Sequence, residues 1–419
     1  MSGDMTEDAM GSRLKATRAV GLAQLAAFVP SAGRAYSAKR NFDFGPGRHV
    51  HVSSLSPYIR HRLISEQEVV TAVLRAHTMA AAEKFVQEVC WRTYWKGWLE
   101  HHPAVWDAYC SEVSHQRDVL REDSAFAALV AAAERGDTGI ACFDTWAREL
   151  IETGYLHNHA RMWFASIWIF TLRLPWALGA EFFYLHLLDG DPASNTLSWR
   201  WVAGLHTRGK TYLARADNIA TYTEGRFQPG RDELASVAIP LSETAERPRG
   251  LLPIGATLPH GTQALLLLTE EDLSAETLPA LGKPHAIGIS GVAIMEPDAE
   301  DGPRFSAVVR AFKTEARHDA KMRAHGIYGQ LPVSVSTADE LIALAYEHSA
   351  SCIITSLMPV GPTREALVPW RVACAEQDLP LHQIVRPWDQ LFWPHATSGF
   401  FKLKERIPRV LLELGIPAK

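Results

Sequence analysis

The chain has 419 residues, of which 47% are hydrophobic and 21% charged, a globular balance that excludes a disordered protein. At about 150 residues per domain, this length predicts two or three domains. Its 42 basic and 47 acidic side chains give a net charge of -5, so charge offers no argument for a nucleic-acid partner. Most of the 13 tryptophans lie before residue 202, so the first half uses large aromatic rings heavily.

The sequence carries no sign of a disulfide framework, a secretion signal or a membrane span. Its five cysteines are scattered and form no C-x-x-C pair, which argues against disulfides and against a zinc or iron–sulfur cage. Residues 1–15 are polar and acidic, without the apolar core of a signal peptide. The most apolar stretch, 162–188, is interrupted by Arg173, Pro175 and Glu181. We expect a soluble, cytoplasmic protein without a membrane partner.

The first half of the chain shows helical periodicity. Residues 1–18 are expected to form a disordered leader, and residues 19–235 an all-helical domain. Within 80–100, apolar side chains recur at steps of three and four residues. Segments rich in glycine and proline separate the predicted helices. These helices are expected over 66–75, 80–100, 124–135, 143–153, 160–172 and 177–188.

The second half alternates short apolar runs with helical patterns. The proline-containing stretch 236–262 is expected to be a linker, and 263–419 an α/β domain. Thr337 and Glu340 form a candidate capping box at one helix start. Strand–helix alternation predicts a doubly wound parallel sheet, Rossmann-like in type, so the chain is expected to be α first and α/β second. Strands are expected over 264–268, 286–294, 332–336, 352–355 and 381–385, and helices over 305–325, 338–348 and 364–377.

Motifs that carry chemistry are sharper in the helical half, because the α/β half lacks both G-x-G-x-x-G and G-x-x-x-x-G-K-[ST]. Three hydroxyls stand just before a proline in the segment 53–58. Ser56 as an N-cap, with Pro57 at the first helical position, explains them as a helix start. Clustered hydroxyls and free N–H groups at a helix start also bind phosphate, and both interpretations stay open.

Aromatic and acidic side chains share one predicted helix face. Trp91, Trp95 and Trp98 recur at helical spacing, which is typical of a core, but Glu88 lies one turn earlier and buried acids need partners. No nucleophile triad or pair of hydrolytic acids can be identified from spacing. The mixture of acids, amides, arginine and indoles suits a large planar ligand with a polar tail better than it suits hydrolysis.

Two motifs raise the question of a metal ion. His157 and His159 form an H-x-H pair without an acid or cysteine at ligand spacing, so a metal is not expected there. The segment 189–191 is similar to the start of a calcium loop, but Ala193 and Arg200 occupy two ligand positions and cannot serve. We therefore expect no metal.

Several segments of the helical half together form a specific pattern. They are Tyr36 with Arg40, then 53–58, 88–92, 153–162, Trp176 and 189–201. In this order and at these intervals, over residues 19–228, they resemble the flavin-binding domain of the photolyase/cryptochrome family. The resemblance implies bound FAD and a light-dependent function.

The second half resembles the α/β antenna domain of the same family. Residues 264–268 are similar to its first strand, and 391–402 to its end. In the family the antenna domain comes first, so the resemblance implies a circular permutation. Such a rearrangement is physically plausible because domain termini often lie close together at the surface. An antenna chromophore of unknown identity in this domain is also implied.

The resemblance assigns one set of residues to FAD. Arg161 and Asp189 would form an ion pair beside the isoalloxazine ring. Asn195, a predicted catalytic residue, would face the reactive ring nitrogen, as in photolyases, and Val52 replaces a threonine of the family. Assigned to the phosphates and adenosine are Tyr36, Ser53, Leu55 and Ser56, and to the ring Arg92, Arg161, Asp189, Asp191 and Asn195.

A second set resembles the pocket that accepts a flipped pyrimidine dimer, since chemistry on a base inside a duplex requires extrusion. Trp91 and Trp201 would stack on the dimer, while Asn158 and a protonated, catalytic Glu88 would hydrogen-bond its carbonyls. Asn158 and Met162 stand where enzymes of the family that repair (6-4) lesions tend to carry histidines, which favours cyclobutane dimers. The implied mechanism is light-driven electron donation from reduced FAD, ring splitting and return of the electron.

Photoreduction of the flavin is implied by two further tryptophans. Trp199 and Trp176 match two members of the family's electron-transfer chain and are predicted catalytic residues. Asp123 stands at the position of the third member, and Trp168 is the candidate substitute.

The residues that would meet DNA depart from the family in one respect. His159 stands where an arginine commonly touches the DNA backbone, which predicts weaker or pH-sensitive binding. Because neither half is basic, DNA binding would depend on a local rim, with Arg40 as the best match and Arg200 and Arg208 as neighbours.

The leading hypothesis is a cyclobutane pyrimidine dimer photolyase, a carbon–carbon lyase that acts as a monomer on UV-damaged DNA. The alternative is a cryptochrome-type blue-light flavin photoreceptor without repair activity. A third hypothesis is repair restricted to single-stranded DNA.

Overall fold

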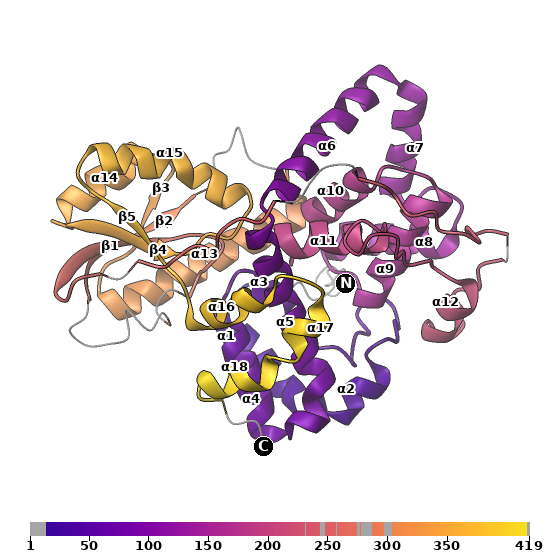
Figure 1. Ribbon diagram of the computed structural model, residues 1–419, viewed down its shortest axis with the longest axis horizontal. Coiled ribbons are helices and arrows are strands. Elements are labelled where there is room, and N and C mark those ends of the chain that lie inside the picture. The colour runs from indigo at the N-terminus through magenta and orange to yellow at the C-terminus, as the bar shows by residue number, and fades with distance from the viewer. Residues whose placement is uncertain are drawn as a thin grey trace, which may run out of the picture.

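The computed structural model describes residues 14–230, 232–243, 248–256, 258–274, 277, 287–296 and 304–416. Within these residues a helical half precedes a five-stranded parallel sheet flanked by helices, which confirms the predicted fold class (Figure 1). The predicted leader lies outside the described residues up to residue 13, and the first helix begins at Arg18.

Helix α5 is the central element of the helical half. It runs over Met79–His101, begins at the N-cap Thr78, and contacts α2, α4 and α11 as well as the last helices of the chain. The helices of this half are α1 (Arg18–Phe28), η1 (Val29–Ser31), α2 (Arg34–Lys39), α3 (Ser56–Arg60), α4 (Glu66–Ala76), α5, α6 (Ala104–Glu122), α7 (Ser124–Arg135), α8 (Ala141–Thr153), α9 (Asn158–Ser166), the π-turn η2 (Ile167–Thr171), α10 (Trp176–His186), α11 (Pro192–Val202) and α12 (Ala216–Tyr222).

All six predicted helices of this half are present, but other helices were not predicted: α1, α2, α11, α12 and, the longest of them, α6. Its buried side chains, Val105, Trp106, Tyr109 and Val113, occupy only its first turns, and the remainder is charged and largely exposed. The apolar period is therefore too short to recognise. The predicted N-cap at Ser56 is wrong: Leu55 holds that position, and Ser56 is the first helical residue.

The sheet has the strand order β3-β2-β1-β4-β5, and every pair is parallel. Its order reverses between β1 and β4. Thr337 and Glu340 form the predicted capping box of α14. The elements are β1 (Thr262–Leu268), β2 (Ile287–Met295), α13 (Ala307–Tyr328), β3 (Val333–Val335), α14 (Ala338–Glu347), β4 (Cys352–Ser356), α15 (Pro362–Glu376) and β5 (Leu381–Ile384).

The alternation of side chains along β1 joins the two halves of the protein. Leu265 and Leu267 belong to an apolar cluster with α14 and α15. Leu266 and Leu268 point to the opposite face, where they share one apolar cluster with Phe312 of α13 and with the whole helical half. Figure 1 shows α14 and α15 on one side of the sheet and α13 on the other.

After β5 the chain leaves the sheet and returns to the helical half. Helices α16 (Pro387–Phe392), η4 (Trp393–His395) and α17 (Phe400–Lys404) contact α5, and α18 (Ile407–Glu413) contacts α16 (Figure 1). Trp388 Nε1 donates to Thr93 Oγ1 at 2.9 Å. The sequence placed all of 263–419 in the α/β domain, whereas these helices pack on α5, because their apolar faces meet partners that are distant in the sequence.

The described residues between α12 and β1 form neither helix nor strand. All five cysteines are described and unpaired. In the described part of the chain, no helix combines the length and apolar character needed to cross a bilayer.

Replacement of Gly97 by alanine should loosen the contact between α5 and the C-terminal helices. A Cβ at this position would lie 2.7 Å from Trp393 Cδ1 and 2.9 Å from Ala396 Cβ, and both neighbours are buried. We expect Gly97→Ala to lower the free energy of unfolding by about 1–3 kcal/mol, measured in urea. Gly326→Ala in α13 is the control: nothing lies within 4 Å, so stability should rise slightly. Equal stability of Gly97→Ala and the unmodified protein would contradict this packing.

Candidate functional site

One cavity in the helical half collects almost all residues that the sequence singled out. Its volume is about 570 Å³, within the usual range of ligand sites, and its lining comes from α2, α3, α5, α9, α11 and the loops beside them. The predicted residues that line it are Tyr36, Arg40, Ser53, Leu55, Ser56, Glu88, Trp91, Arg92, Asn158, Arg161, Met162, Asp189, Asp191, Asn195, Trp199 and Trp201. Trp176 lies outside it.

Asp189 occupies the short loop between α10 and α11. Its Oδ2 accepts a hydrogen bond from Arg161 Nη1 at 3.0 Å, so the expected ion pair is present. Arg161 is itself oriented by a bond from Nε to Leu156 O at 2.8 Å. Burial by itself would raise the pKa of Asp189, but the guanidinium groups of Arg161 and Arg92 outweigh it and hold this pKa below its ordinary value. The carboxylate is therefore ionised at neutral pH.

Asp191 begins α11 and carries a second buried negative charge. Its Oδ1 accepts from Ser194 N at 2.7 Å as the N-cap, and Lys96 Nζ lies 3.2 Å from its Oδ2. Burial opposes ionisation, yet Lys96, Arg92 and Arg60 hold the pKa of Asp191 well below its ordinary value. Lys96 was missed in the sequence, although it follows Arg92 by one helical turn on α5 and therefore faces the same side.

The loop that carries both aspartates is anchored to the sheet by buried charges. Arg60 Nε donates to Gly190 O at 2.8 Å, and its two terminal nitrogens each reach one carboxylate oxygen of Glu271 at 2.8 Å. Glu271 follows β1, and Lys96 Nζ lies 3.7 Å from it. This chain of charges fixes the position of the loop relative to the carboxyl end of the sheet.

Several buried polar atoms at the cavity have no hydrogen-bond partner among the described residues. They are Arg92 Nη1, Asp189 Oδ1 and Ser194 Oγ. Buried polar groups in folded proteins are nearly always satisfied, so such a cluster indicates where the polar atoms of a ligand bind. Asn195 adds a hydrogen-bond acceptor to the cavity. Its Nδ2 donates to Ala180 O at 2.6 Å, and this bond fixes the orientation of the amide and leaves Oδ1 as its acceptor.

Glu88 and Arg40 face each other across another part of the lining. The guanidinium of Arg40 pairs with the carboxylate of Glu88. Burial raises the pKa of Glu88, and Arg40 opposes this shift without cancelling it. Glu88 therefore holds a proton more readily than an exposed glutamate does. Arg40, expected on the DNA-binding rim, is paired within the site instead.

The two tryptophans expected to stack on a substrate are each backed by another aromatic ring. Trp91 stacks on Phe400 of α17, with ring centres 3.8 Å apart and planes at 12°. Trp201 stacks on Tyr212 with centres 5.7 Å apart. Phe400 could not be identified from the sequence, because it meets α5 only through the return of the C-terminal helices.

The predicted electron-transfer residues have close aromatic neighbours. Trp199 is buried, and its ring centre lies 6.2 Å from that of Trp168, which is also buried. Trp176 packs instead on Tyr109, with ring centres 5.6 Å apart. Asp123, at the position expected for the third tryptophan, is the exposed N-cap of α7 and accepts from Phe126 N. Tyr109 was not singled out in the sequence because α6 was not recognised.

Two side chains considered for contact with DNA are bound to other parts of the protein. His159 Nδ1 lies 3.1 Å from Asn41 O, its ring stacks on Trp163 at 4.2 Å, and burial lowers its pKa. The ring is half-buried and lines the cavity, and the lowered pKa favours the neutral imidazole. Arg200 is buried and pairs with Glu243 at 2.6 Å, whereas Arg208 is exposed.

The H-x-H pair belongs to a helix start. Burial lowers the pKa of His157 to about 4, and its Nδ1 accepts a hydrogen bond from His159 N at 3.2 Å as the cap of α9. In the ranges that the structure describes, no group of three or more potential metal ligands lies close enough together to hold an ion.

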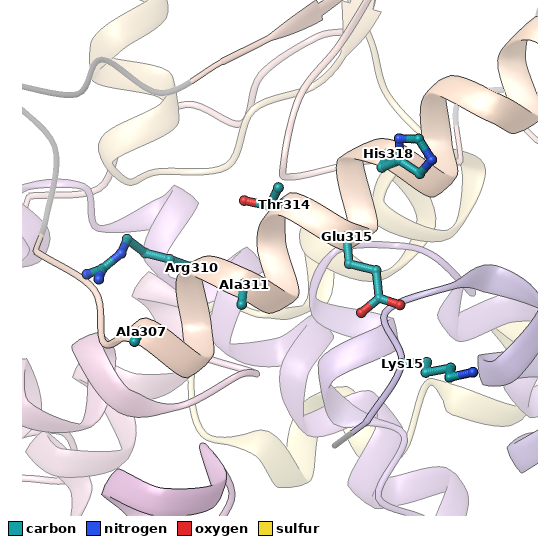
Figure 2. A pocket seen from close by; sticks show the side chains of 7 residues that line it. All are labelled: Lys15, Ala307, Arg310, Ala311, Thr314, Glu315 and His318. Atoms are coloured by element: carbon teal, nitrogen blue, oxygen red, sulfur yellow. The ribbon is translucent and has the colours of Figure 1, made fainter. Parts of the chain in front are cut away.

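A second hollow, of about 920 Å³, lies along α13 and is open to solvent (Figure 2). Its lining consists of Lys15, Ala307, Arg310, Ala311, Thr314, Glu315 and His318. In Figure 2, Glu315 points towards the segment that carries Lys15, so charges of opposite sign face one another. Arg310 donates to Phe305 O of its own segment. This hollow contains none of the residues singled out in the sequence and is not the candidate site.

Many of the residues that line the cavity lie in a part of the chain that matches a known protein family. Residues 85–228 match the family described as the FAD binding domain of DNA photolyase. The deoxyribodipyrimidine photo-lyase of Streptomyces griseus is 34% identical over 179 residues, 40% of this chain and 38% of that protein. The one from Alkalihalophilus pseudofirmus is 31% identical over 185 residues, 42% of this chain and 36% of that protein. A class III photolyase structure from Agrobacterium tumefaciens is 26% identical with a TM-score of 0.40, covering 50% of this chain and 43% of that one. The chain spans less than half the length of the curated relatives.

The residues present fit FAD. An isoalloxazine ring offers N–H donors and carbonyl acceptors along one edge, which complement the unpaired atoms of Asp189 and Arg92. Ser53 and Ser56 line the same cavity beside Ser54, whose left-handed φ of 49° turns the backbone sharply before α3. Hydroxyls at such a turn suit the phosphates.

Asp191→Asn should destabilise the fold, because asparagine can still cap α11 but leaves Lys96 with one less buried negative charge. We expect a loss of about 3 kcal/mol in the free energy of unfolding. Asp217→Asn is the matched control. Asp217 pairs with Arg215 at the exposed surface, so the free energy of unfolding of this variant should equal that of the unmodified protein.

The pH dependence provides a second readout for Asp191→Asn. Because the pKa of Asp191 is lowered in the folded protein, its contribution is present at neutral pH and is lost as pH falls through that pKa. Unfolding free energy of the unmodified protein should therefore fall more steeply than that of the variant below about pH 4. Parallel curves would contradict the assignment of this charge.

Proposed function

We propose that the chain belongs to the photolyase/cryptochrome family and that it splits cyclobutane pyrimidine dimers in UV-damaged DNA in a light-dependent reaction with FAD. The relatives named deoxyribodipyrimidine photo-lyase lend this activity its main support. The single observation that carries the proposal is the common cavity. Segments from residue 36 to residue 201 place the proposed flavin and dimer residues around one space.

The FAD side of the cavity is formed by charged and amide groups of this chain. Asp189 and Arg161 would flank the ring, and the network behind Asp191 would prevent either acid from turning away. Asn195, with its Nδ2 committed to Ala180, would present its Oδ1 to an N–H of the ring. When bound and reduced, FAD supplies the electron that light sends to the dimer and receives it back, so the reaction has no net redox change.

The dimer side is formed by an acid, an amide and apolar rings. Burial raises the pKa of Glu88 and so favours its protonated carboxyl, which would donate a hydrogen bond to a dimer carbonyl once Arg40 is displaced, with Asn158 donating a second. Trp91 and Trp201 would stack on the flipped bases, and Met162 would fill the remaining apolar space. Trp199 and Trp176 would deliver electrons that restore the reduced cofactor.

The arrangement of the chain relative to its family is also a proposal. A flavin-binding unit (19–235) would precede an antenna-like unit (263–419), the reverse of the family order, as expected for a circular permutation. The reversal of strand order between β1 and β4 is where a doubly wound sheet binds ligands, and an antenna chromophore would belong there.

One observation favours the alternative, a cryptochrome-type photoreceptor without repair. Arg40, the best-matched DNA contact, is paired with Glu88, and His159 is bound through Nδ1 to Asn41 O at 3.1 Å. DNA must therefore displace the Arg40–Glu88 pair to reach both groups, whereas a signalling protein needs neither.

Repair of a defined dimer under blue light separates these hypotheses. The reduced protein should remove a cyclobutane dimer from single- and double-stranded oligonucleotides in light and not in darkness. We expect Glu88→Gln to slow dimer loss by about tenfold or more, because the N–H of glutamine is a weaker hydrogen-bond donor than the O–H of a carboxyl group. Glu83→Gln, on the same helix but paired with Lys404, is the control that should repair normally.

The outcomes of this assay select among the three hypotheses. Failure to repair either substrate would remove the enzyme and leave the photoreceptor. Repair of the single strand alone would restrict the activity to single-stranded DNA.

Asn195→Asp should change which redox state of the bound flavin is stable, since a carboxylate opposes negative charge on the neighbouring ring. Absorption spectra recorded during illumination and reoxidation would measure this change. Asn218→Asp is the control, because residue 218 lies outside the cavity. An aspartate at this position also keeps the oxygen that accepts a hydrogen bond from Trp163 Nε1. Identical spectra for Asn195→Asp and the unmodified protein would count against the assignment of Asn195.

A further inference from the structure

The ion pair of Arg40 and Glu88 lies on the wall of the proposed dimer site. Both side chains line the cavity, and the guanidinium of Arg40 donates to the carboxylate of Glu88. Arg40 is the C-cap of α2, whereas Glu88 belongs to α5. The two groups come from different helices, so a rotation of the Arg40 side chain is enough to open the pair.

This pair is only partly buried. The side chain of Arg40 is 26% exposed and that of Glu88 31% exposed. Water competes for both charges of such a pair, which is therefore held weakly. The pair of Arg60 and Glu271 differs, because its side chains are 1% and 5% exposed. The contact between Arg40 and Glu88 can thus be exchanged for another one, whereas the anchor at Arg60 is fixed.

Arg40 is the main group that keeps Glu88 charged. Burial raises the pKa of Glu88, and this shift is opposed first by Arg40 and more weakly by Lys84, an exposed side chain one turn earlier on α5. Tyr36 of α2 and His159 of α9 lie near Arg40, and burial favours the uncharged form of both. Loss of Arg40 would leave the burial of Glu88 almost unopposed, and a carboxyl group in that condition takes up a proton.

Charged side chains on the other helices around α5 have partners of their own or face solvent. Arg92, one turn after Glu88, lies 3.8 Å from both Asp189 and Asp191. Arg40 and Lys84 are therefore the charges among the described residues that act on Glu88. The others are Arg34 and Lys39 of α2, which are exposed, Glu66 of α4 near Arg62, Asp191 of α11 with Lys96, Asp389 of α16 with Arg62, His395 of η4 near Arg406, and Lys404 of α17 with Glu83.

We propose that binding of damaged DNA opens the pair of Arg40 and Glu88 and is coupled to the uptake of one proton by Glu88. The inference rests on the proposed function. Arg40 exchanges the carboxylate for a phosphate oxygen of the DNA backbone, an acceptor that also carries negative charge. Glu88 takes the proton from solvent as the extruded dimer excludes water from the cavity, and its new O–H donates to a dimer carbonyl. Arg40 is then a positioning residue, since it controls the protonation of Glu88.

This exchange selects for a ligand with two features. A phosphate can attract Arg40, but without a dimer the cavity keeps its water and Glu88 keeps its charge. A dimer carbonyl beside an ionised Glu88 finds no donor there, because a carboxylate only accepts hydrogen bonds. A strand with a phosphate next to an extruded dimer satisfies both groups. Proton uptake should therefore accompany damaged DNA and not undamaged DNA.

Calorimetry in darkness measures this proton without any turnover. The FAD-loaded protein is titrated at neutral pH with a single strand that contains one cyclobutane dimer, in buffers of different ionisation enthalpy. The dependence of the binding enthalpy on the buffer gives the number of protons taken up. We expect at least about half a proton for the unmodified protein and almost none for Glu88→Gln. Equal uptake by Glu88→Gln would show that another group, such as His159, takes the proton.

Variants of Arg40 test the exchange itself. In Arg40→Gln, Glu88 holds more of its proton before DNA binds, so uptake should fall by about twofold or more. The slope of log K against log salt should also fall by about one, because one phosphate contact is lost. Arg40→Lys keeps the charge and should restore both values in part. Unchanged uptake and an unchanged salt slope in Arg40→Gln would overturn the exchange.

Arg117→Gln is the matched control for these variants. Arg117 also pairs with a glutamate, Glu181, whose pKa is raised by burial, but this pair lies outside the cavity. Its proton uptake and its salt slope should equal those of the unmodified protein.

The pH dependence of binding has a defined sign. Binding raises the pKa of Glu88, so the complex holds more protons than the free protein. Kd for the damaged strand should therefore rise by up to about tenfold per pH unit above the pKa of the free protein, and Kd of Glu88→Gln should stay constant. If the unmodified protein prefers damaged DNA but takes up no proton, the exchange is wrong and the proposed function stands. If it does not prefer damaged over undamaged DNA, the proposed function fails and this inference fails with it.

Discussion

The buried guanidinium of Arg60 is the constraint on which the site depends. It binds both carboxylate oxygens of Glu271 at the end of β1 and, through Nε, the carbonyl of Gly190 between the two site aspartates. Removal of one partner from such a buried network leaves an uncompensated charge, at a cost of about 3–5 kcal/mol. The sheet therefore helps to fix the position of the loop that carries both site aspartates, although none of the residues that line the cavity belongs to the sheet.

Burial explains why this network positions groups so firmly. Lys96 lies between Asp191 and Glu271, so it balances one acid of the cavity and one acid of the sheet. Each group loses its hydration on folding, and this loss is compensated only when its charged and hydrogen-bonding partners are correctly placed. The apolar core acts in the same direction: alternate side chains of β1 pack into the core of the helical half. The two halves thus share both charge and apolar contacts.

The C-terminal helices also hold residues of the helical half in place. Phe400 supports Trp91, and Trp393 fills the space that Gly97 leaves on α5. An α/β unit would ordinarily end with its last strand and helix. Here the chain beyond β5 supports Trp91, one of the cavity-lining residues, all of which come from the first half.

The sequence by itself determined the local elements and, through a resemblance, predicted the residues of the site. Apolar periodicity located the strands and the long helices, because this signal depends on near neighbours along the chain. The ordered segments from Tyr36 to Trp201 resemble those of the photolyase/cryptochrome family and predicted residues that line the cavity. The sequence missed α6, whose apolar stripe is short, and it misjudged Arg200, whose burial depends on a distant partner. Only the tertiary structure decided the Arg60–Glu271 anchor, the Arg40–Glu88 pair and the place of Phe400. These contacts join residues far apart in the chain, and burial and charge pairing select them only once the whole core has formed.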